Sequence, residues 1–200
     1  MSQFIESIKL HNGQLFLLSE HETRLNKTRA EVLGLDQPIH LHAFLYPLLK
    51  DYPKGLFKVR VLYAAGINKI EIHPYQQRSI RHLKVVAGNV DYTYKRANRE
   101  ALQQLYLQRG TCDDVIIIKD NLVTDSYYAN LVFDDGQIWW TPSTPLLKGV
   151  QRAFLLQENI IKEGILHKED IPSFKQVKLL NAMMDWVDAP VVAIENVVMF

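Results

Sequence analysis

The stretch that decides the fold covers residues 115–133 and reads VIIIKDNLVTDSYYANLVF. Its first four residues form a continuous β-branched run, which is typical of a strand buried on both faces. Residues 130–133 resemble a second strand, and the Asp135-Gly136 dipeptide indicates a turn that leads back into residues 137–140. We therefore expect a buried strand followed by a β-hairpin.

Strands and helices alternate on the N-terminal side of this stretch. Residues 4–18 predict a hairpin around an Asn12-Gly13 turn. Ser19 is followed three residues later by Glu22, which predicts a capping box and a helix that starts there and ends at Gly34. One more helix and three strands are then expected, over residues 38–50, 56–64, 68–73 and 83–86.

The C-terminal side continues the alternation. Asn98 is expected to cap a helix that ends near residue 108. Gly149 is expected to precede a helix that Gly164 ends, with apolar residues facing inward at positions 153, 154, 156, 160 and 161. Residues 190–198 are rich in strand-forming residues. The pattern predicts an α/β (α+β) protein with two lobes, a smaller N-terminal one over residues 1–89 and a larger C-terminal one over residues 90–200.

Composition excludes several classes of function. The net charge is +1, from 23 basic and 22 acidic residues, so nothing predicts a nucleic-acid or anionic membrane partner. Glu6 and Lys9 interrupt the apolar N-terminal stretch, which argues against a signal peptide or membrane anchor. Cys112 is the single cysteine and suits a reducing compartment, so a cytoplasmic location is expected.

Familiar catalytic and metal-binding motifs are missing. The sequence has no glycine-rich phosphate loop, no HExxH and no cysteine cluster, and Ser126 lies in no GxSxG motif. His40 and His42 are two residues apart, but no carboxylate partner is evident in the sequence around them. A surface or capping role is expected for these histidines, and no metal site is predicted.

Four segments stand out together: HETRL at 21–25, DYTYKR at 91–96, TDSYYANLVF at 124–133 and TPSTPLLKGVQR at 141–152. Their order and spacing resemble those of the class IV aminotransferases, which include branched-chain and D-amino-acid aminotransferases and aminodeoxychorismate lyase. The resemblance extends over almost the whole chain, from ESIKLHNG to residues 178–183. It implies a fold-type IV enzyme like D-amino-acid aminotransferase with a compact N-terminal lobe, pyridoxal 5'-phosphate as cofactor and a homodimer.

The resemblance makes Lys95 the catalytic lysine that binds the cofactor as a Schiff base, an internal aldimine. Such a lysine must lose its proton near neutral pH, and burial favours the neutral amine. Tyr92, Tyr94 and an apolar strand flank Lys95, so partial burial is expected. From the residues alone, a solvated lysine at a strand end beside Arg96 would be favoured, and only the resemblance reverses this interpretation.

Asp125 corresponds to the carboxylate that keeps the cofactor's pyridine nitrogen protonated. Most members of the family have glutamate there, so Asp125 is a departure. Without the resemblance, Asp125 could be a turn residue before a strand. Tyr128, in the same segment, is also expected to bind the cofactor.

The cofactor's phosphate is expected to bind Arg24 and the N-terminus of the helix after Gly149. Arg24 matches the family's phosphate-binding arginine, although it could be a surface residue of an amphipathic helix. Val150 and Gln151 would contribute backbone N–H groups. Gln151 is a second departure, because other members often have threonine there. Asn181 and Ala182 match the late segment that closes around the phosphate.

Substrate and reaction remain open at this level. Arg60 is the expected partner of a substrate carboxylate, although a solvated sheet face explains it equally well. The chain is expected to transaminate an amino acid or to act as a 4-amino-4-deoxychorismate lyase. The compact first lobe slightly favours lyase-like or narrow-substrate members of the family. The alternative, suggested by Asp125 and Gln151, is an impaired family member that binds the cofactor or a metabolite without turnover.

Overall fold

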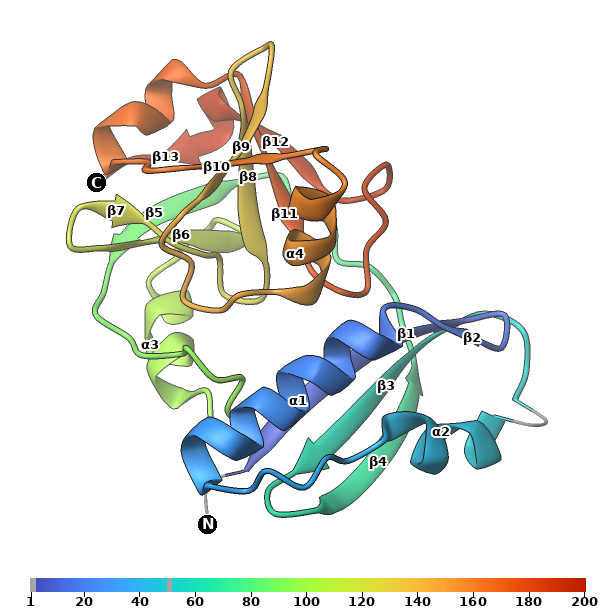
Figure 1. Ribbon diagram of the computed structural model, residues 1–200. Helices are drawn as coiled ribbons and strands as arrows, with labels where there is room; N and C mark the ends of the chain where they lie inside the picture. The colour runs from blue at the N-terminus through green and yellow to red at the C-terminus, as the bar shows by residue number, and fades with distance from the viewer. Residues whose placement is uncertain (1–2, 50–51) are drawn as a thin grey trace. The chain divides into compact units, whose positions relative to one another are not determined.

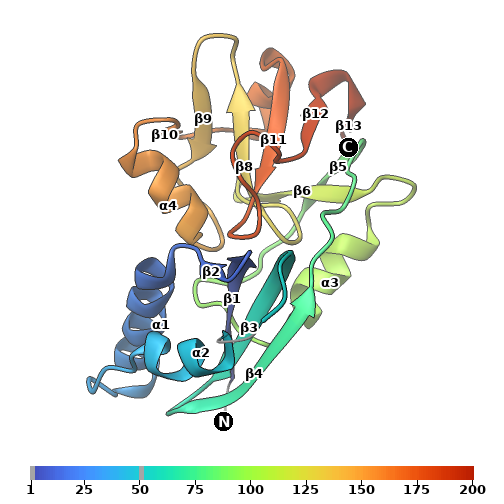
Figure 2. The same ribbon diagram turned by 90° about the vertical axis from the view of Figure 1, so that its right-hand side faces the viewer.

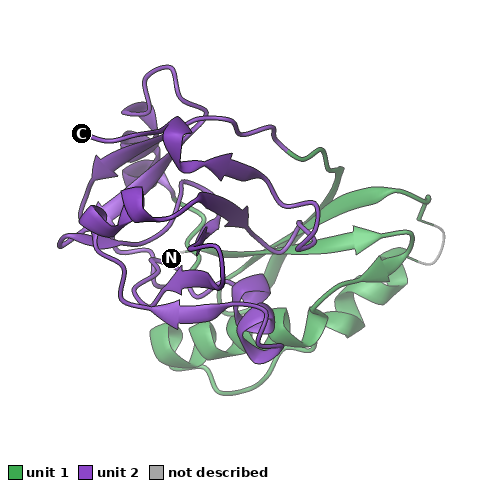
Figure 3. Cartoon of the chain, turned by 90° about the horizontal axis from the view of Figure 1, so that it is seen from above, with its two compact units in different colours: residues 1–77, 94–98 green, residues 78–93, 99–200 purple. Residues whose placement is uncertain are grey.

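The computed structural model describes residues 3–49 and 52–200 and has the expected mixed α/β fold (Figure 1). Its contacts divide the chain into two compact units, residues 1–77 with 94–98 and residues 78–93 with 99–200 (Figure 3). From the sequence, a single boundary after residue 89 was expected, and the limits of the two units differ from it. Residues 94–98 join the first unit because Ile5 N–H donates to Lys95 O at 2.9 Å and Ala97 N–H donates to Gln3 O at 2.8 Å.

The first unit is built on an antiparallel sheet in the order β2-β1-β3-β4. The strands are β1 (Phe4–His11), β2 (Gln14–Leu15), β3 (Leu56–Tyr63) and β4 (Ile67–Pro74). The predicted first hairpin is confirmed, although its second strand ends at Leu15 and does not reach Leu18. Asn12 and Gly13 have φ values of 51° and 83°, the left-handed conformations that a two-residue hairpin turn requires.

Two helices cover one face of this sheet, α1 (Leu18–Leu33) and α2 (Leu41–Leu49) (Figure 2). Alternate residues of β1 and β3 face them and form one buried apolar cluster with Leu25 of α1 and Leu41 and Leu45 of α2. The strand residues of this cluster are Phe4, Ile8, Leu10, Val59, Val61 and Tyr63. The face of β1 that packs against α1 also includes position 6.

The expected start of α1 is wrong. Leu17 occupies the N-cap position with φ 50°, and no side chain caps the helix. Ser19 Oγ donates to Glu20, and Glu22 instead accepts the backbone N–H of Leu41 at 2.7 Å. The predicted end at Gly34 is confirmed by its left-handed φ of 66°. The second helix begins at Leu41 rather than near residue 38, and its predicted end at residue 50 lies outside the described residues.

The second unit contains two sheets, in the orders β13-β5-β6-β7 and β10-β9-β8-β11-β12. The first has β5 (Leu83–Ala87), β6 (Asp114–Lys119), β7 (Leu122–Val123) and β13 (Val197–Val198). The second has β8 (Asn130–Asp134), β9 (Trp139–Pro142), β10 (Lys162–Gly164), β11 (Gln176–Leu180) and β12 (Val191–Ala193). The remaining elements are α3 (Glu100–Leu107), α4 (Val150–Gln157) and two short 3₁₀ helices, η1 (Lys168–Ser173) and η2 (Ile194–Asn196).

Strand β6 is buried on both faces, as its β-branched run predicts. Ile116 and Ile118 join a core formed with β8 and β11, whereas Val115 and Ile117 join a core formed with α3. The predicted hairpin after it is also confirmed, because Phe133 of β8 pairs with Trp140 of β9. Strand β6, which lies upstream of Asp125, is therefore packed on both faces.

Two helix predictions in this unit need correction. Helix α3 begins after Arg99 rather than after Asn98. Helix α4 starts after Gly149 as expected but ends at Gln157, and residues 162–164 form β10, parallel to β9.

The predicted inward face of this segment is confirmed only in part, because Phe154, Leu156 and Ile161 do pack into an apolar core. Ala153 and Ile160 are exposed, while Arg152 and Leu155 are buried. Arg152 tolerates burial because it donates to Pro142 O at 2.8 Å and pairs with Glu163 at 2.5 Å.

Candidate active site

Arg24 is held by a buried carboxylate in the first unit. Arg24 Nε donates to Glu6 Oε1 at 2.9 Å, and Nη2 donates to Glu6 Oε2 at 2.5 Å. His21 Nδ1 lies 2.6 Å from the same Oε2. Glu6 is on β1, while His21 and Arg24 lie one turn apart on α1. This two-point pairing fixes the position and the plane of the guanidinium.

The electrostatics of this group follow from burial and pairing. Burial alone would raise the pKa of Glu6, but Arg24 and His21 outweigh it and lower that pKa to about 2. Burial lowers the pKa of His21, and the positive charges of Arg24 and Lys95 lower it further. At neutral pH the group therefore holds an ionised Glu6, a cationic Arg24 and a neutral His21.

Lys95 lies in the same unit. Its segment runs beside the start of β1, where Phe4 and Arg96 form an antiparallel bridge. The residue is half-buried, as expected from its tyrosine neighbours. Lys95 therefore lies in the same unit as Glu6, His21 and Arg24, and its positive charge contributes to the lowered pKa of His21.

Asp125 is buried in the second unit, where neighbours fix both of its carboxylate oxygens. Its Oδ1 accepts Asn130 Nδ2 at 2.7 Å, and its Oδ2 accepts the N–H of Leu147 at 2.9 Å. The backbone carbonyl of Asp125 accepts the N–H of Ile117 on β6 at 2.9 Å. Burial raises the pKa of Asp125 to about 6 although these donors oppose the shift. The enclosure thus penalises its negative charge, which a nearby cation would stabilise.

Asn130 connects Asp125 to the start of α4. Its Nδ2 donates to Leu147 O at 2.8 Å as well as to Asp125. A Cβ atom added at Gly149 would collide with Asn130 Oδ1, so any larger residue here would have to displace Asn130. No side-chain hydrogen bond caps α4, so the backbone N–H groups of Val150 and Gln151 lie at an uncapped helix N-terminus.

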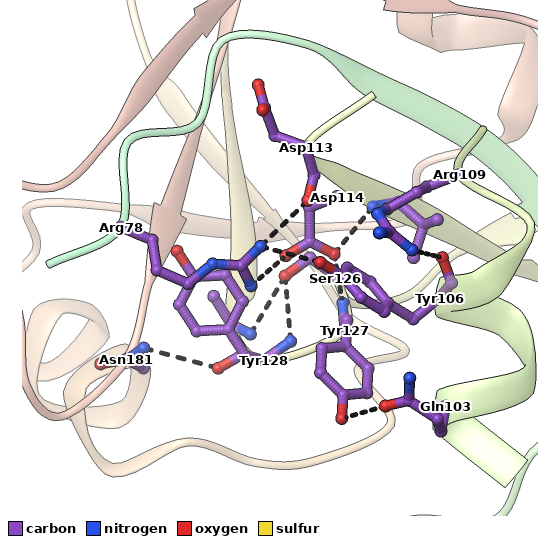
Figure 4. A network of polar contacts seen from close by, with 12 residues as sticks. Arg78, Gln103, Tyr106, Arg109, Asp113, Asp114, Ser126, Tyr127, Tyr128 and Asn181 are labelled. Carbon is purple, nitrogen blue, oxygen red and sulfur yellow. Dashed lines mark hydrogen bonds and ion pairs between the residues drawn. The ribbon is translucent and has the colours of Figure 1, made fainter. Parts of the chain in front are cut away.

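Tyr128 and Asn181 are brought together in the second unit. Asn181 Nδ2 donates to Tyr128 O at 3.5 Å, a long contact (Figure 4). The guanidinium carbon of Arg78 lies 5.1 Å from the centre of the Tyr128 ring. Ala182 follows Asn181 and is half-buried. The predicted cofactor residues Tyr128, Asn181 and Ala182 therefore occupy one region of this unit.

The loop before Tyr128 is anchored by a carboxylate that the sequence analysis missed. Asp114 Oδ1 accepts the N–H of Tyr127 at 3.1 Å, and Tyr127 Oη donates to Gln103 at 2.7 Å (Figure 4). Asp114 is fully buried, and burial raises its pKa to about 6. These contacts fix the segment that links Asp125 to Asn130.

Arg60 is paired within its own sheet. Its Nη1 donates to Glu71 Oε2 at 2.7 Å on the neighbouring strand, at the position directly opposite. Lys69 approaches the other oxygen of Glu71 at 2.7 Å. These contacts, led by that of Lys69, lower the pKa of Glu71 to about 2. A substrate role for Arg60 stays a prediction.

Four residues of the site were not predicted from the sequence: Glu6, His21, Asp114 and Asn130. Glu6 had a usable signal, because it is an acidic residue on the inward face of an alternating strand, where a charge needs a partner. His21 and Asn130 lie inside segments that the sequence analysis singled out. Their roles depend on contacts with residues 15 and 17 positions away, which local patterns do not predict.

Two further findings concern membrane spans and family membership. Within the described residues, every helix is too short or too polar to cross a membrane. The amino-transferase class IV family model matches residues 3–192.

Individual proteins agree with this match. An uncharacterized protein of Haemophilus influenzae is 34% identical over 185 residues, which cover 92% of this chain and 98% of that protein. A crystal structure from Haemophilus somnus, provisionally named a 4-amino-4-deoxychorismate lyase, superposes with a TM-score of 0.86 at 32% identity, over 92% of this chain and 97% of that one. The pyridoxal-phosphate-bound form of a hypothetical aminotransferase from Mycobacterium tuberculosis has the same fold, with a TM-score of 0.79 at 15% identity over 95% of this chain and 80% of that one. The chain therefore belongs to the amino-transferase class IV family.

Proposed function

We propose that this protein is a pyridoxal-phosphate enzyme that acts on an amino substrate, with Lys95 as the residue that binds the cofactor covalently. The observation on which this proposal mainly rests is that a half-buried lysine, Lys95, lies in the same unit as an arginine that Glu6 holds rigidly. The amine can form an imine with an aldehyde, and the oriented guanidinium can bind a phosphate, so the two residues suit a small molecule that carries both groups.

The N-terminus of α4 supports a phosphate ligand as well. Val150 and Gln151 present backbone N–H groups that no side chain caps. Gly149 keeps this end of the helix clear, because any larger residue would displace Asn130. An anion at such a helix end is favoured both by the N–H donors and by the helix dipole.

The environment of Asp125 supports the proposal that the cofactor has a nitrogen heterocycle. Its ionised form is penalised by burial, so a protonated ring nitrogen opposite it would stabilise the carboxylate and be stabilised in return. Asn130 and Leu147 fix the carboxylate from the protein side. The shorter side chain of aspartate is therefore compatible with the role that glutamate has in most relatives.

The cofactor and the protein would have different roles in the reaction. When bound, pyridoxal phosphate withdraws electrons from the substrate carbon that bears the amine. Lys95 Nζ removes the proton from that carbon and returns a proton later, as general base and then general acid. Arg24 orients the ligand through its phosphate, and Asp125 keeps the ring nitrogen protonated.

For the reaction itself, we propose 4-amino-4-deoxychorismate lyase activity first and amino-acid transamination second. The lyase is supported by the 32% identity to the Haemophilus somnus protein that has this provisional name. Transamination is supported by the family to which the chain belongs. Both reactions begin with the same proton removal by Lys95, so Lys95, Arg24 and Asp125 do not distinguish them.

The test of Lys95 is direct. Purified protein incubated with pyridoxal phosphate should acquire the visible absorbance of the lysine-bound cofactor. Borohydride reduction followed by peptide mapping should place the label on Lys95. Lys95→Ala should lose both signals and all turnover, whereas Lys27→Ala, an exposed lysine on α1, should keep them. A label on another lysine, or a fully active Lys95→Ala variant, would refute the assignment.

A substrate panel then tests the reaction. Cofactor-loaded protein should release pyruvate from aminodeoxychorismate, and L- and D-amino donors should be assayed in parallel for keto-acid formation. Pyruvate release without keto acids supports the lyase, and the reverse supports a transaminase. If a loaded protein turns over none of these substrates, the enzyme proposal fails and a protein that binds the cofactor without turnover takes its place.

We also propose a homodimer in the cytoplasm. The homodimer is suggested by the resemblance to class IV aminotransferases, and the location is suggested by the single, buried cysteine. A sedimentation equilibrium mass of one chain at micromolar concentration would argue against the dimer.

A further inference from the structure

Three potential metal ligands, two of them exposed, come together in the first unit. They are Glu22 of α1, His40 in the segment before α2, and His42 in the first turn of α2. One ligand atom from each lies within 4.8 Å of the other two. No metal was predicted here from the sequence, because the carboxylate is 18 residues away from His40 and is brought beside it only by the fold.

The carboxylate of this cluster is held in place. Glu22 Oε2 accepts the N–H of Leu41 at 2.7 Å, and Oε1 lies 3.1 Å from His40 Nδ1. Glu22 is thereby turned away from its own helix and toward the start of α2. A backbone donor on the second oxygen is the kind of outer contact that orients a ligating carboxylate.

The imidazoles can adjust to a metal ion. The His40 side chain is 58% exposed, and the rings of His40 and His42 are 5.9 Å apart. A zinc ion with bonds of about 2.1 Å needs its ligand atoms about 3.4 Å apart in a tetrahedral site. Small rotations of exposed rings achieve this change without movement of the backbone.

Space for the remaining ligands is available beside the cluster. Glu22 and His42 line an open hollow of about 540 Å³, together with residues 17–20. A metal ion held by two imidazoles and one carboxylate has a coordination position left for water or a small ligand, which this hollow would accommodate.

We propose that Glu22, His40 and His42 bind a divalent transition-metal ion, zinc foremost, which bridges α1 to the start of α2. Two imidazoles and a carboxylate are the ligand set that zinc and its neighbours accept, and an oxygen-seeking ion such as Mg²⁺ does not favour it. The site uses residues other than Lys95, Arg24 and Asp125. It therefore stands independently of the proposed reaction.

Metal titration of the full-length protein tests the site. Metal-free protein, with and without pyridoxal phosphate, is titrated with Zn²⁺ by calorimetry and with Co²⁺ by visible absorbance. One ion per chain is expected, with a thermal unfolding midpoint that rises with Zn²⁺ concentration. His42→Ala should weaken binding at least tenfold and abolish the Co²⁺ absorbance, and His40→Ala should do the same.

Matched controls separate this site from adventitious binding. His73→Ala removes another exposed histidine of the same unit and should leave affinity and midpoint shift unchanged. Cys112→Ser should also leave them unchanged, because burial raises the pKa of that thiol and keeps it protonated. Equal Zn²⁺ affinity in the wild type and the His40→Ala/His42→Ala double variant, or loss of binding in Cys112→Ser, would overturn the proposal. So would the failure of wild-type protein to bind either ion at micromolar concentration.

Discussion

At the scale of single residues, Glu6 has the central role in the first unit. A fully buried carboxylate is costly unless cations compensate it, and here Arg24 does so through two hydrogen bonds. The same pairing fixes the guanidinium in one orientation before any ligand arrives. Pre-organisation of this kind strengthens binding because the ligand does not have to order the side chain.

Arg24→Lys tests this role. Lysine keeps the positive charge beside Glu6 but cannot form the two-point contact. We expect pyridoxal-phosphate affinity to fall roughly tenfold to hundredfold, equivalent to the loss of one charged hydrogen bond of about 1.5–3 kcal/mol. Cofactor titration followed by absorbance measures the change.

The control is Lys27→Arg, an opposite exchange on the exposed side of the same helix. It should leave cofactor affinity unchanged. If Arg24→Lys binds the cofactor as tightly as the wild type, Arg24 has no role in phosphate binding.

At the scale of elements, local signals predicted what local contacts determine. The Asn12-Gly13 turn, the end of α1 at Gly34 and the start of α4 after Gly149 all depend on a few neighbouring residues. The predicted capping box of α1 was wrong because Glu22 accepts a backbone hydrogen bond from the start of α2 and not from its own helix. The predicted helix was too long at residues 162–164, because these residues pair in parallel with β9 instead of continuing the helix.

The candidate site divides in the same way. Arg24, Lys95 and Asp125 were predicted because their segments resemble a family, not because their own chemistry is distinctive. Glu6 and Asn130 were not predicted, since each acts through contacts distant in sequence. A charged residue on the inward face of an alternating strand is the one sequence pattern from which the role of Glu6 could have been inferred.

The junction of β8 and α4 gives an element-scale prediction. Gly149 has an ordinary φ of −68°, so only the collision with Asn130 Oδ1 excludes a side chain there. Gly149→Ala should destabilise the protein by about 1–3 kcal/mol and weaken cofactor binding, because Asn130 must move away from Asp125. Chemical denaturation and cofactor titration measure the two effects.

Gly66→Ala is the matched control, because its added Cβ would meet open space. That variant should be neutral or slightly more stable, by up to about 1 kcal/mol. A Gly149→Ala variant as stable as Gly66→Ala would show that the junction is not tightly packed.

At the scale of the whole molecule, the two units contain buried carboxyl groups with opposite pKa shifts. Pairing lowers the pKa of Glu6 to about 2, so its stabilisation is complete above the ordinary value of 4.5 and is lost as pH falls toward 2. Burial raises the pKa of Asp125 from 3.8 to about 6. Its ionisation in the folded state therefore costs stability as pH rises from 3.8 to 6.

These opposite signs give a prediction for the cofactor-free protein. The stability lost in Glu6→Gln relative to the wild type should grow as pH rises from 2 to 4.5 and then stay constant. The stability lost in Asp125→Asn should be largest below pH 3.8 and should shrink by on the order of 3 kcal/mol as pH rises past 6. Denaturant unfolding is followed by circular dichroism for the whole chain, and by tryptophan fluorescence for the second unit, which contains Trp139, Trp140 and Trp186.

Pyridoxal phosphate should change only one of the two profiles. A protonated ring nitrogen opposite Asp125 favours the ionised carboxylate, so the loaded wild type should no longer lose stability relative to Asp125→Asn between pH 4 and 6. The Glu6→Gln profile below pH 4.5 should keep its sign, because Arg24 still needs its partner. An Asp125→Asn profile that is unaffected by the cofactor would mean that Asp125 does not face the ring nitrogen. Profiles of the same sign for both variants would contradict the opposite shifts themselves.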